Sequence, residues 1–168
     1  MLKKILILFM TTLVLIGCST QKEEKPEVRV PKALEKFDSL QHLTFEEVDE
    51  FLTDKKSGIL YFGWIVRCGD SLNFQENYLE EKLNNNPELK NNIFVVNLET
   101  ENPDGLMNRD LRLPMQEKYG VGYSPTILLV KEGVVTLKSE WQVKTSDPIT
   151  AIPKTELDAF FTEAGYNQ

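Results

Sequence analysis

Apolar and polar positions between residues 44 and 163 follow two patterns. Short unbroken apolar runs predict buried strands, whereas apolar residues three or four positions apart predict helices with one buried face. The expected strands are Ile59–Phe62, Ile93–Leu98, Pro125–Val130 and Val134–Leu137. The expected helices are Phe45 to about Lys55, Ser71–Asn84, Leu113–Tyr119 and a last one that opens at Pro153-Lys154-Thr155-Glu156. This alternation predicts an α/β domain with a central mixed β-sheet flanked by helices.

Local signals mark the ends of several of these elements. Thr44, with Glu47 three residues later, matches a helix capping box. The run Asn84-Asn85-Asn86-Pro87 ends the second helix, and Gly120 is placed to cap the third. Lys131-Glu132-Gly133 predicts the turn of a hairpin between the last two strands.

The beginning of the chain has the pattern of an export signal. Two lysines precede the apolar run Ile5–Ile16, which is shorter than the ~20 residues of a membrane-spanning helix. The run and the Gly17-Cys18 pair after it resemble the signal of bacterial lipoproteins. That resemblance implies cleavage before Cys18 and its acylation at the outer face of the cell membrane. The alternative is an uncleaved anchor helix. We expect a signal peptide over residues 1–17, a lipidated Cys18 with a flexible tether over 18–40, and one domain over 41–168.

The composition of the chain limits the partners and the kinds of site that it could have. The 168 residues carry a net charge of −7, and cleavage would leave 17 basic against 26 acidic residues, a charge of −9. An acidic chain with a pI near 4.9 argues against nucleic acid as a partner. One histidine, His42, and two cysteines, Cys18 and Cys68, exclude a Cys/His metal centre, and a Ser-His-Asp site would need His42. No metal and no cofactor is expected. With Cys18 acylated, Cys68 is the one free thiol and no intramolecular disulfide can form.

A resemblance to a known family rests on three segments. A cysteine lies between the first strand and the second helix, Tyr123-Ser124-Pro125-Thr126 precedes the hairpin, and Lys118-Tyr119-Gly120-Val121 leads into it. Together they resemble the thioredoxin superfamily over roughly residues 40 to 165. The Tyr61-Phe62-Gly63 lead-in is most similar to Gram-positive thioredoxin-like proteins called bacteriocin transport accessory proteins.

The resemblance implies a thioredoxin-like fold and a role for four residues. It places Cys68 at the attacking position and Ser71 where a resolving cysteine would stand. It also implies a cis peptide bond at Pro125, opposite Cys68, and a backbone at Ser124 that pairs with an extended substrate peptide.

The chain also departs from the family pattern. The second active-site cysteine is absent, so Cys68 can attack a disulfide but cannot release the product alone. Tyr61 stands where the family has a buried acid, the loop before Cys68 carries an inserted residue, and Trp64 is not adjacent to the cysteine. The charge of Arg67 would favour a thiolate and that of Asp70 would oppose it. A dithiol reductase is therefore not expected.

Several candidate residues have a structural alternative. Cys68 could be the relic of a lost site, and Ser71 is expected to cap a helix rather than to catalyse. The aromatic residues Trp141, Phe160 and Phe161 are expected to pack in the core or hairpin, and His42 is expected at the surface. The acids of Glu99–Asp104 do not have calcium-loop spacing, and this stretch, with its turn at 102–105, is expected to form a solvated polar loop.

Two functions remain. The first is thiol–disulfide exchange through Cys68 with an exported protein or peptide that contains cysteine, on the outer face of a bacterial cell membrane, which we expect to be Gram-positive. The alternative is a non-catalytic peptide-binding or secretion-accessory lipoprotein that holds an extended peptide by strand addition. In both, the lipid bilayer is contacted through Cys18.

Overall fold

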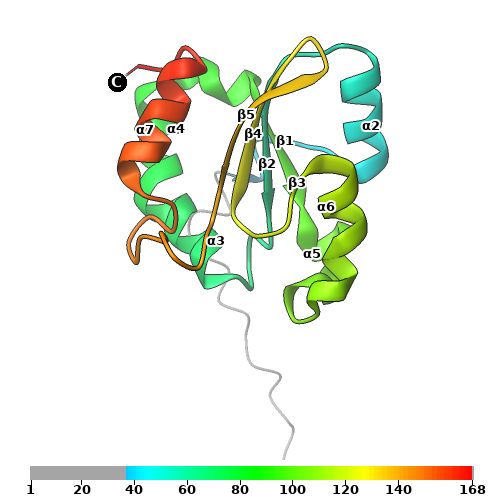
Figure 1. The fold of residues 1–168 in the computed structure, drawn as a ribbon. Helices are drawn as coiled ribbons and strands as arrows, with labels where there is room; N and C mark the ends of the chain where they lie inside the picture. Colours follow the sequence, from blue (N-terminus) through cyan, green and yellow to red (C-terminus); the bar gives the residue numbers. More distant parts are fainter. Residues whose placement is uncertain (1–36, 168) are drawn as a thin grey trace, which may run out of the picture.

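The computed structural model describes residues 37–167 (Figure 1). Its centre is a five-stranded sheet in the order β1-β3-β2-β4-β5. The strands are β1 (Gln41–His42), β2 (Gly58–Gly63), β3 (Ile93–Asn97), β4 (Thr126–Lys131) and β5 (Val134–Glu140). Strands β1, β3 and β2 are parallel, β4 is antiparallel to β2, and β5 is antiparallel to β4. The predicted signal peptide, Cys18 and the tether up to residue 36 lie outside the described residues.

Helices cover both faces of this sheet. They are α2 (Phe45–Thr53), α3 (Gly69–Phe74), the π-helical turn η1 (Gln75–Leu79), α4 (Glu80–Asn85), η2 (Pro87–Asn91), α5 (Leu98–Glu101), η3 (Pro103–Leu106), η4 (Arg109–Arg112), α6 (Leu113–Tyr119) and α7 (Lys154–Glu163). The continuous run α3-η1-α4 lies with α7 on one face, and α2 and α6 lie on the other (Figure 1). The predicted α/β architecture with a central mixed sheet is confirmed. Within residues 37–167, no helix is long and apolar enough to cross a membrane.

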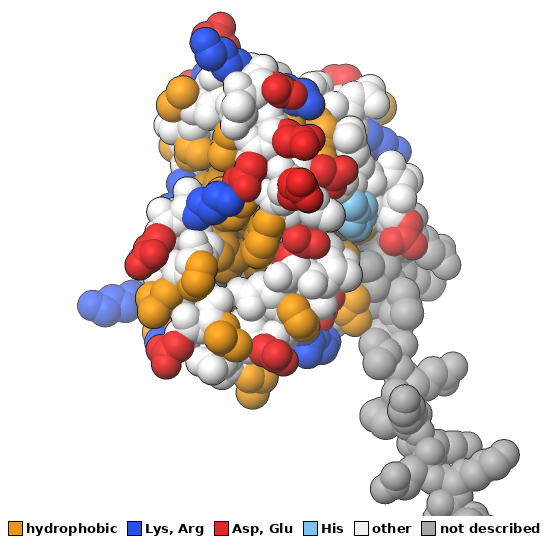
Figure 2. Space-filling model, turned by 90° about the vertical axis from the view of Figure 1, so that its right-hand side faces the viewer, with side chains coloured by type: hydrophobic (Ala, Val, Ile, Leu, Met, Phe, Trp, Pro, Cys, Tyr) orange, Lys and Arg blue, Asp and Glu red, His pale blue; other side chains and the backbone are white. Residues whose placement is uncertain are grey.

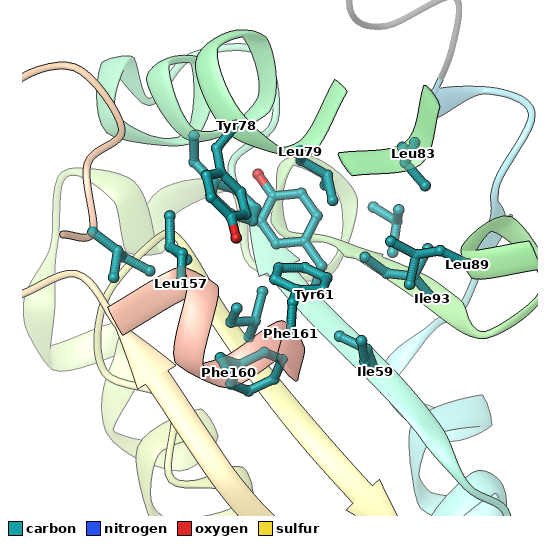
Figure 3. Packing of buried hydrophobic residues seen from close by; sticks show 14 of the residues in the cluster. Ile59, Tyr61, Tyr78, Leu79, Leu83, Leu89, Ile93, Leu157, Phe160 and Phe161 are labelled. Carbon is teal, nitrogen blue, oxygen red and sulfur yellow. The ribbon is translucent and has the colours of Figure 1, made fainter. Parts of the chain in front are cut away.

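The side chains of β2 alternate between the two halves of the core. Ile59 and Tyr61 pack against the α3–α4 run and α7, where Phe160 and Phe161 lie in the core as predicted (Figure 3). The next residues along the strand, Leu60 and Phe62, pack against α2 and α6. A strand covered on both faces buries every side chain, so it appears in the sequence as an unbroken apolar run. Each such side chain contributes about 1.5–3 kcal/mol of burial free energy.

Most of the predicted helix caps and turns are confirmed. The Thr44 hydroxyl accepts from the Glu47 backbone N–H at 3.2 Å, and the Glu47 carboxylate accepts from the Thr44 N–H at 2.8 Å, which completes the capping box. Gly120 ends α6 with a left-handed φ of 74°. The hairpin turns at Gly133, whose N–H donates to the carbonyl of Lys56. His42 is exposed as expected, and its ring nitrogen lies 3.0 Å from the Phe37 carbonyl.

Some elements differ from the prediction. Strand β1 has only two residues, both exposed, and therefore has no apolar pattern. The second helix begins at Gly69 rather than Ser71, and Leu98 starts α5 rather than ending β3. Phe37 and Leu40 are buried in the core, so packing begins ahead of the expected domain start at residue 41.

Candidate functional site

Cys68 lies at the start of a helix, beyond the end of β2. It is the N-cap residue of α3, with its backbone in an extended conformation, and its carbonyl accepts from the Leu72 N–H at 3.0 Å. The side chain makes no capping hydrogen bond, is half-buried, and is a free thiol. Helix N-termini carry unpaired N–H groups and a positive dipole end, which stabilise a nearby thiolate. Cys68 therefore lies at the N-terminus of a helix while its partly buried side chain packs against the core cluster formed with α2 and α6.

The loop that carries Ser124 and Pro125 faces this thiol. The Ser124–Pro125 peptide bond is cis, as expected, and the Ser124 carbonyl lies 3.7 Å from the Cys68 sulfur. Glu140, 8% exposed, holds the loop from behind. One of its carboxylate oxygens accepts from the N–H groups of Gly122, at 2.8 Å, and Tyr123, at 3.1 Å. The cis-proline loop is thus held in place opposite the thiol by contacts that come from β5.

Ser71 is part of a buried hydrogen-bond pair. Its hydroxyl oxygen lies 2.5 Å from that of Ser124, which also accepts from the Trp64 N–H at 3.2 Å. The prediction that Ser71 caps the helix is wrong, because α3 begins at Gly69 and places Ser71 inside its first turn with no exposed surface. Ser71 instead ties α3 to the cis-proline loop.

Tyr61 and Gln75 form the floor below this pair. Both are fully buried, and the Gln75 amide N–H donates to the Tyr61 hydroxyl at 3.0 Å and to the Ile65 carbonyl at 3.2 Å. Burial raises the pKa of Tyr61, while hydrogen bonding to Ser71 and Gln75 opposes the shift. The phenol therefore stays neutral and cannot replace the proton-accepting acid of the resembled family.

The loop before Cys68 is fixed by an acid that was expected in a solvated loop. Glu99 accepts from the N–H groups of Val66, at 3.2 Å, and Arg67, at 2.8 Å, and forms an ion pair with the Arg67 side chain. Glu101 accepts from the Phe45 N–H at 2.8 Å. The expectation of a solvated polar loop is therefore wrong: short helical turns replace it, and two of its acids bind backbone groups. The charge of Arg67 is paired with Glu99 rather than directed at Cys68.

A cavity of about 180 Å³ opens beside Cys68. Its wall is drawn from four separate parts of the chain and consists of Trp64, Cys68, Asp70, Leu106, Arg109, Arg112, Tyr123, Ser124 and Trp141. Trp64 is fully buried and donates its indole N–H to the Asn102 carbonyl at 2.9 Å. Although Trp64 is separated from the cysteine in sequence, it lines the same cavity. Trp141, expected to pack in the hairpin, also belongs to this wall.

Sequence reasoning placed Cys68, Ser71, Ser124 and Pro125 at one site, and the structure brings them together. It missed Arg109, Arg112, Gln75 and Glu140, which come from segments without a recognisable spacing, and it gave no role to Tyr123, which precedes Ser124 in a recognised segment. Among residues 37–167, no group of three or more His, Cys, Asp or Glu side chains could hold a metal ion.

The chain was also compared with known proteins. No protein-family model matches it, and a search of curated proteins finds no match.

Proposed function

We propose that this protein has a thioredoxin-like fold and carries out thiol–disulfide exchange through the single thiol of Cys68. The observation that carries the proposal is the position of Cys68 at the N-terminus of α3, with its sulfur 3.7 Å from the carbonyl that precedes the cis-proline. The five-stranded mixed sheet with helices on both faces supports the fold. The adjacent cavity leaves space for part of a substrate.

The exchange step balances without a cofactor. The Cys68 thiolate attacks one sulfur of a client disulfide, the client S–S bond breaks, and the other client sulfur leaves as a thiolate. Cys68 becomes oxidised in the mixed disulfide, and the leaving sulfur is reduced. Because the described residues hold no second cysteine, a thiolate of the client or of a small thiol must attack the mixed disulfide and release Cys68.

We further propose that the protein works at the outer face of a bacterial cell membrane, held by an acylated Cys18. The short apolar run, the basic start and the Gly17-Cys18 junction support this location. Radiolabelled palmitate fed to expressing Gram-positive cells should enter the protein, and Cys18→Ser should abolish the label. Labelling that survives Cys18→Ser would contradict the anchor.

A non-catalytic peptide-binding protein is the second candidate. The observation in its favour is that the buried Ser71 stands where a resolving cysteine would be needed. The chain alone could therefore not release a client bound covalently to Cys68. Under this function, a peptide that lacks cysteine would bind as well as one that contains a disulfide, and Cys68→Ser would bind both unchanged.

The test is formation of a mixed disulfide. The full chain with Cys18→Ser is mixed with a short peptide disulfide, and intact mass is followed over time. Thiol exchange predicts a single adduct of the peptide on Cys68, reversed by a small thiol and absent from Cys68→Ser. A folded protein that gains no adduct while it binds the peptide would support the binding function instead.

A further inference from the structure

The cavity beside Cys68 is lined by charged side chains that have no part in the proposed exchange step. Two arginines and one acid line it: Arg109, Arg112 and Asp70. The arginines come from η4, whereas Asp70 follows Cys68 in α3. An excess of positive charge in a partly enclosed site attracts an anionic group of a ligand.

The charge of Arg112 has no carboxylate partner among residues 37–167. Its guanidinium donates to three backbone carbonyls, those of Gly105, Leu106 and Gly122. It also lies over the Trp64 ring, 5.0 Å from the ring centre. Burial lowers the pKa of Arg112 and the neighbouring positive charge of Arg109 adds to that shift, whereas the Cys68 side chain acts in the opposite direction. Arg112 is thus held rigidly within electrostatic range of the thiol.

Arg109 is the exposed arginine of this pair. Its described contact is with the Tyr123 ring, whose centre lies 5.6 Å from the guanidinium carbon. In the part of the chain that the structure describes, no carboxylate forms an ion pair with it. An exposed guanidinium at the cavity wall is free to form a two-point contact with a carboxylate.

Asp70 opposes this attraction without cancelling it. Burial raises its pKa, and the Trp141 side chain acts in the opposite direction. Two cations therefore remain against one acid on the cavity wall.

We propose that this cavity binds a carboxylate next to the reacting cysteine of the client, so that Cys68 selects disulfides flanked by aspartate or glutamate. Arg109 forms the contact, and Arg112 supplies a fixed positive field. This inference rests on the proposed thiol exchange and names its substrate class. Apolar side chains are visible at several places on the face in Figure 2, and the segment of η3 and η4 exposes Met107 and Leu111. The client proposed here is a peptide with an acid at the cavity and apolar residues beside it.

The test compares peptides that differ by one charge. Three short peptides carry Cys followed by Asp, Asn or Lys, each as a mixed disulfide with 2-thiopyridine. Attack by the Cys68 thiolate on the peptide sulfur forms the Cys68–peptide disulfide and releases pyridine-2-thione, whose absorbance gives the rate. The protein is the full chain in detergent with Cys18→Ser, so that Cys68 is its one thiol. Dividing the Asp rate by the Asn rate cancels differences in the intrinsic reactivity of the thiol between variants.

We expect the Asp peptide to react about fivefold faster than the Asn peptide, and the Lys peptide more slowly than both. Added salt should bring the ratio towards one. Arg109→Gln should lower the Asp/Asn ratio to near one, and Asp70→Asn should raise it. Lys90→Gln is the matched control, because Lys90 is exposed on η2, which precedes β3, whereas Cys68 follows the far end of the parallel strand β2.

The outcomes separate the two proposals. Equal rates for the Asp and Asn peptides, or an Asp preference that Arg109→Gln leaves intact, would overturn the carboxylate site while thiol exchange stands. A folded protein that reacts with none of the three peptides would overturn the proposed thiol exchange itself.

Discussion

Beneath Cys68, the polar groups of Tyr61, Ser71 and Gln75 are fully buried and bonded largely to one another and to Ser124. One atom, the Gln75 side-chain oxygen, has no hydrogen-bond partner among the described residues. A buried polar network is costly unless its geometry is held, so these contacts fix the distance between α3 and the cis-proline loop. At this scale, Ser71 positions the cis-proline loop through its contact with Ser124.

Tyr61→Phe should change how stability depends on pH. Burial raises the pKa of Tyr61 above its ordinary value of 10.0 in the folded protein. Above pH 10 the unfolded state loses the phenol proton while the folded state keeps it. The free energy of unfolding is therefore unaffected by this group below pH 10 and falls as the pH rises above it. In the wild type this loss of stability amounts to up to about 1.4 kcal/mol per pH unit above pH 10, and Tyr61→Phe should abolish it.

Urea unfolding at pH 9 and pH 11 measures that change. The matched control is Tyr166→Phe at the half-exposed C-terminal tyrosine, which should follow the wild type. The same loss of stability in Tyr61→Phe and wild type between the two pH values would contradict a buried, neutral phenol.

Ser71→Cys should create a disulfide with Cys68. Residues three apart at the start of a helix face the same side, within the range that a disulfide bridges. After mild oxidation, the variant should lose both free thiols, as counted by alkylation and mass. The second thiol should also shorten the lifetime of a client adduct by about tenfold or more, because attack becomes intramolecular. Ser71→Ala is the control and should keep one thiol; two free thiols after oxidation of Ser71→Cys would argue against the positions of the side chains.

At the scale of elements, the hairpin β4–β5 meets the end of α2 through its turn. Gly133 has a left-handed φ of 77°, and a β-carbon there would lie 2.1 Å from the Leu52 carbonyl oxygen. Gly120 has a similar φ of 74° but open space around it. The first glycine is required by both conformation and packing, the second by conformation alone.

Gly133→Ala should therefore be much more destabilising than Gly120→Ala. We expect about 1 kcal/mol for Gly120→Ala from the backbone alone, and at least about 3 kcal/mol for Gly133→Ala, since α2 or the turn must move. Chemical denaturation of both variants at neutral pH tests the difference. Equal losses would mean that the turn does not pack on α2.

Most elements could be predicted because their signals are local. The capping box at Thr44, the glycine after Tyr119 and the apolar runs of β2 and β4 each act within a few residues. Strand β1 could not, because its pairing partner β3 lies far away in the sequence. The π-helical turn at Gln75–Leu79 has no local signal in the sequence either. The start of α3 was placed two residues late because Ser71 matches a cap locally while its real bond is to Ser124.

At the scale of the whole molecule, the residues at the thiol could be predicted from the sequence, whereas the residues that line the cavity beside it could not. Cys68 and Pro125 follow from a family resemblance, but Arg109, Arg112 and Trp141 reach the cavity only through the path of the chain between β3 and β4 and after β5. No spacing in the sequence connects them. Under the proposed function, the fold would set where the thiol reacts, and these later segments would set what can approach it.

The proposed thiol exchange requires Cys68 to be a reactive thiol in the folded protein. The most direct measurement is the rate of its alkylation by iodoacetamide in the full chain with Cys18→Ser, folded in buffer and unfolded in urea at the same pH. The position at the α3 N-terminus beside the cavity predicts that the folded chain reacts at least as fast as the unfolded one. A folded chain that reacts about a hundredfold more slowly, and only as fast as it unfolds, would show Cys68 to be a buried remnant and would contradict the proposed exchange.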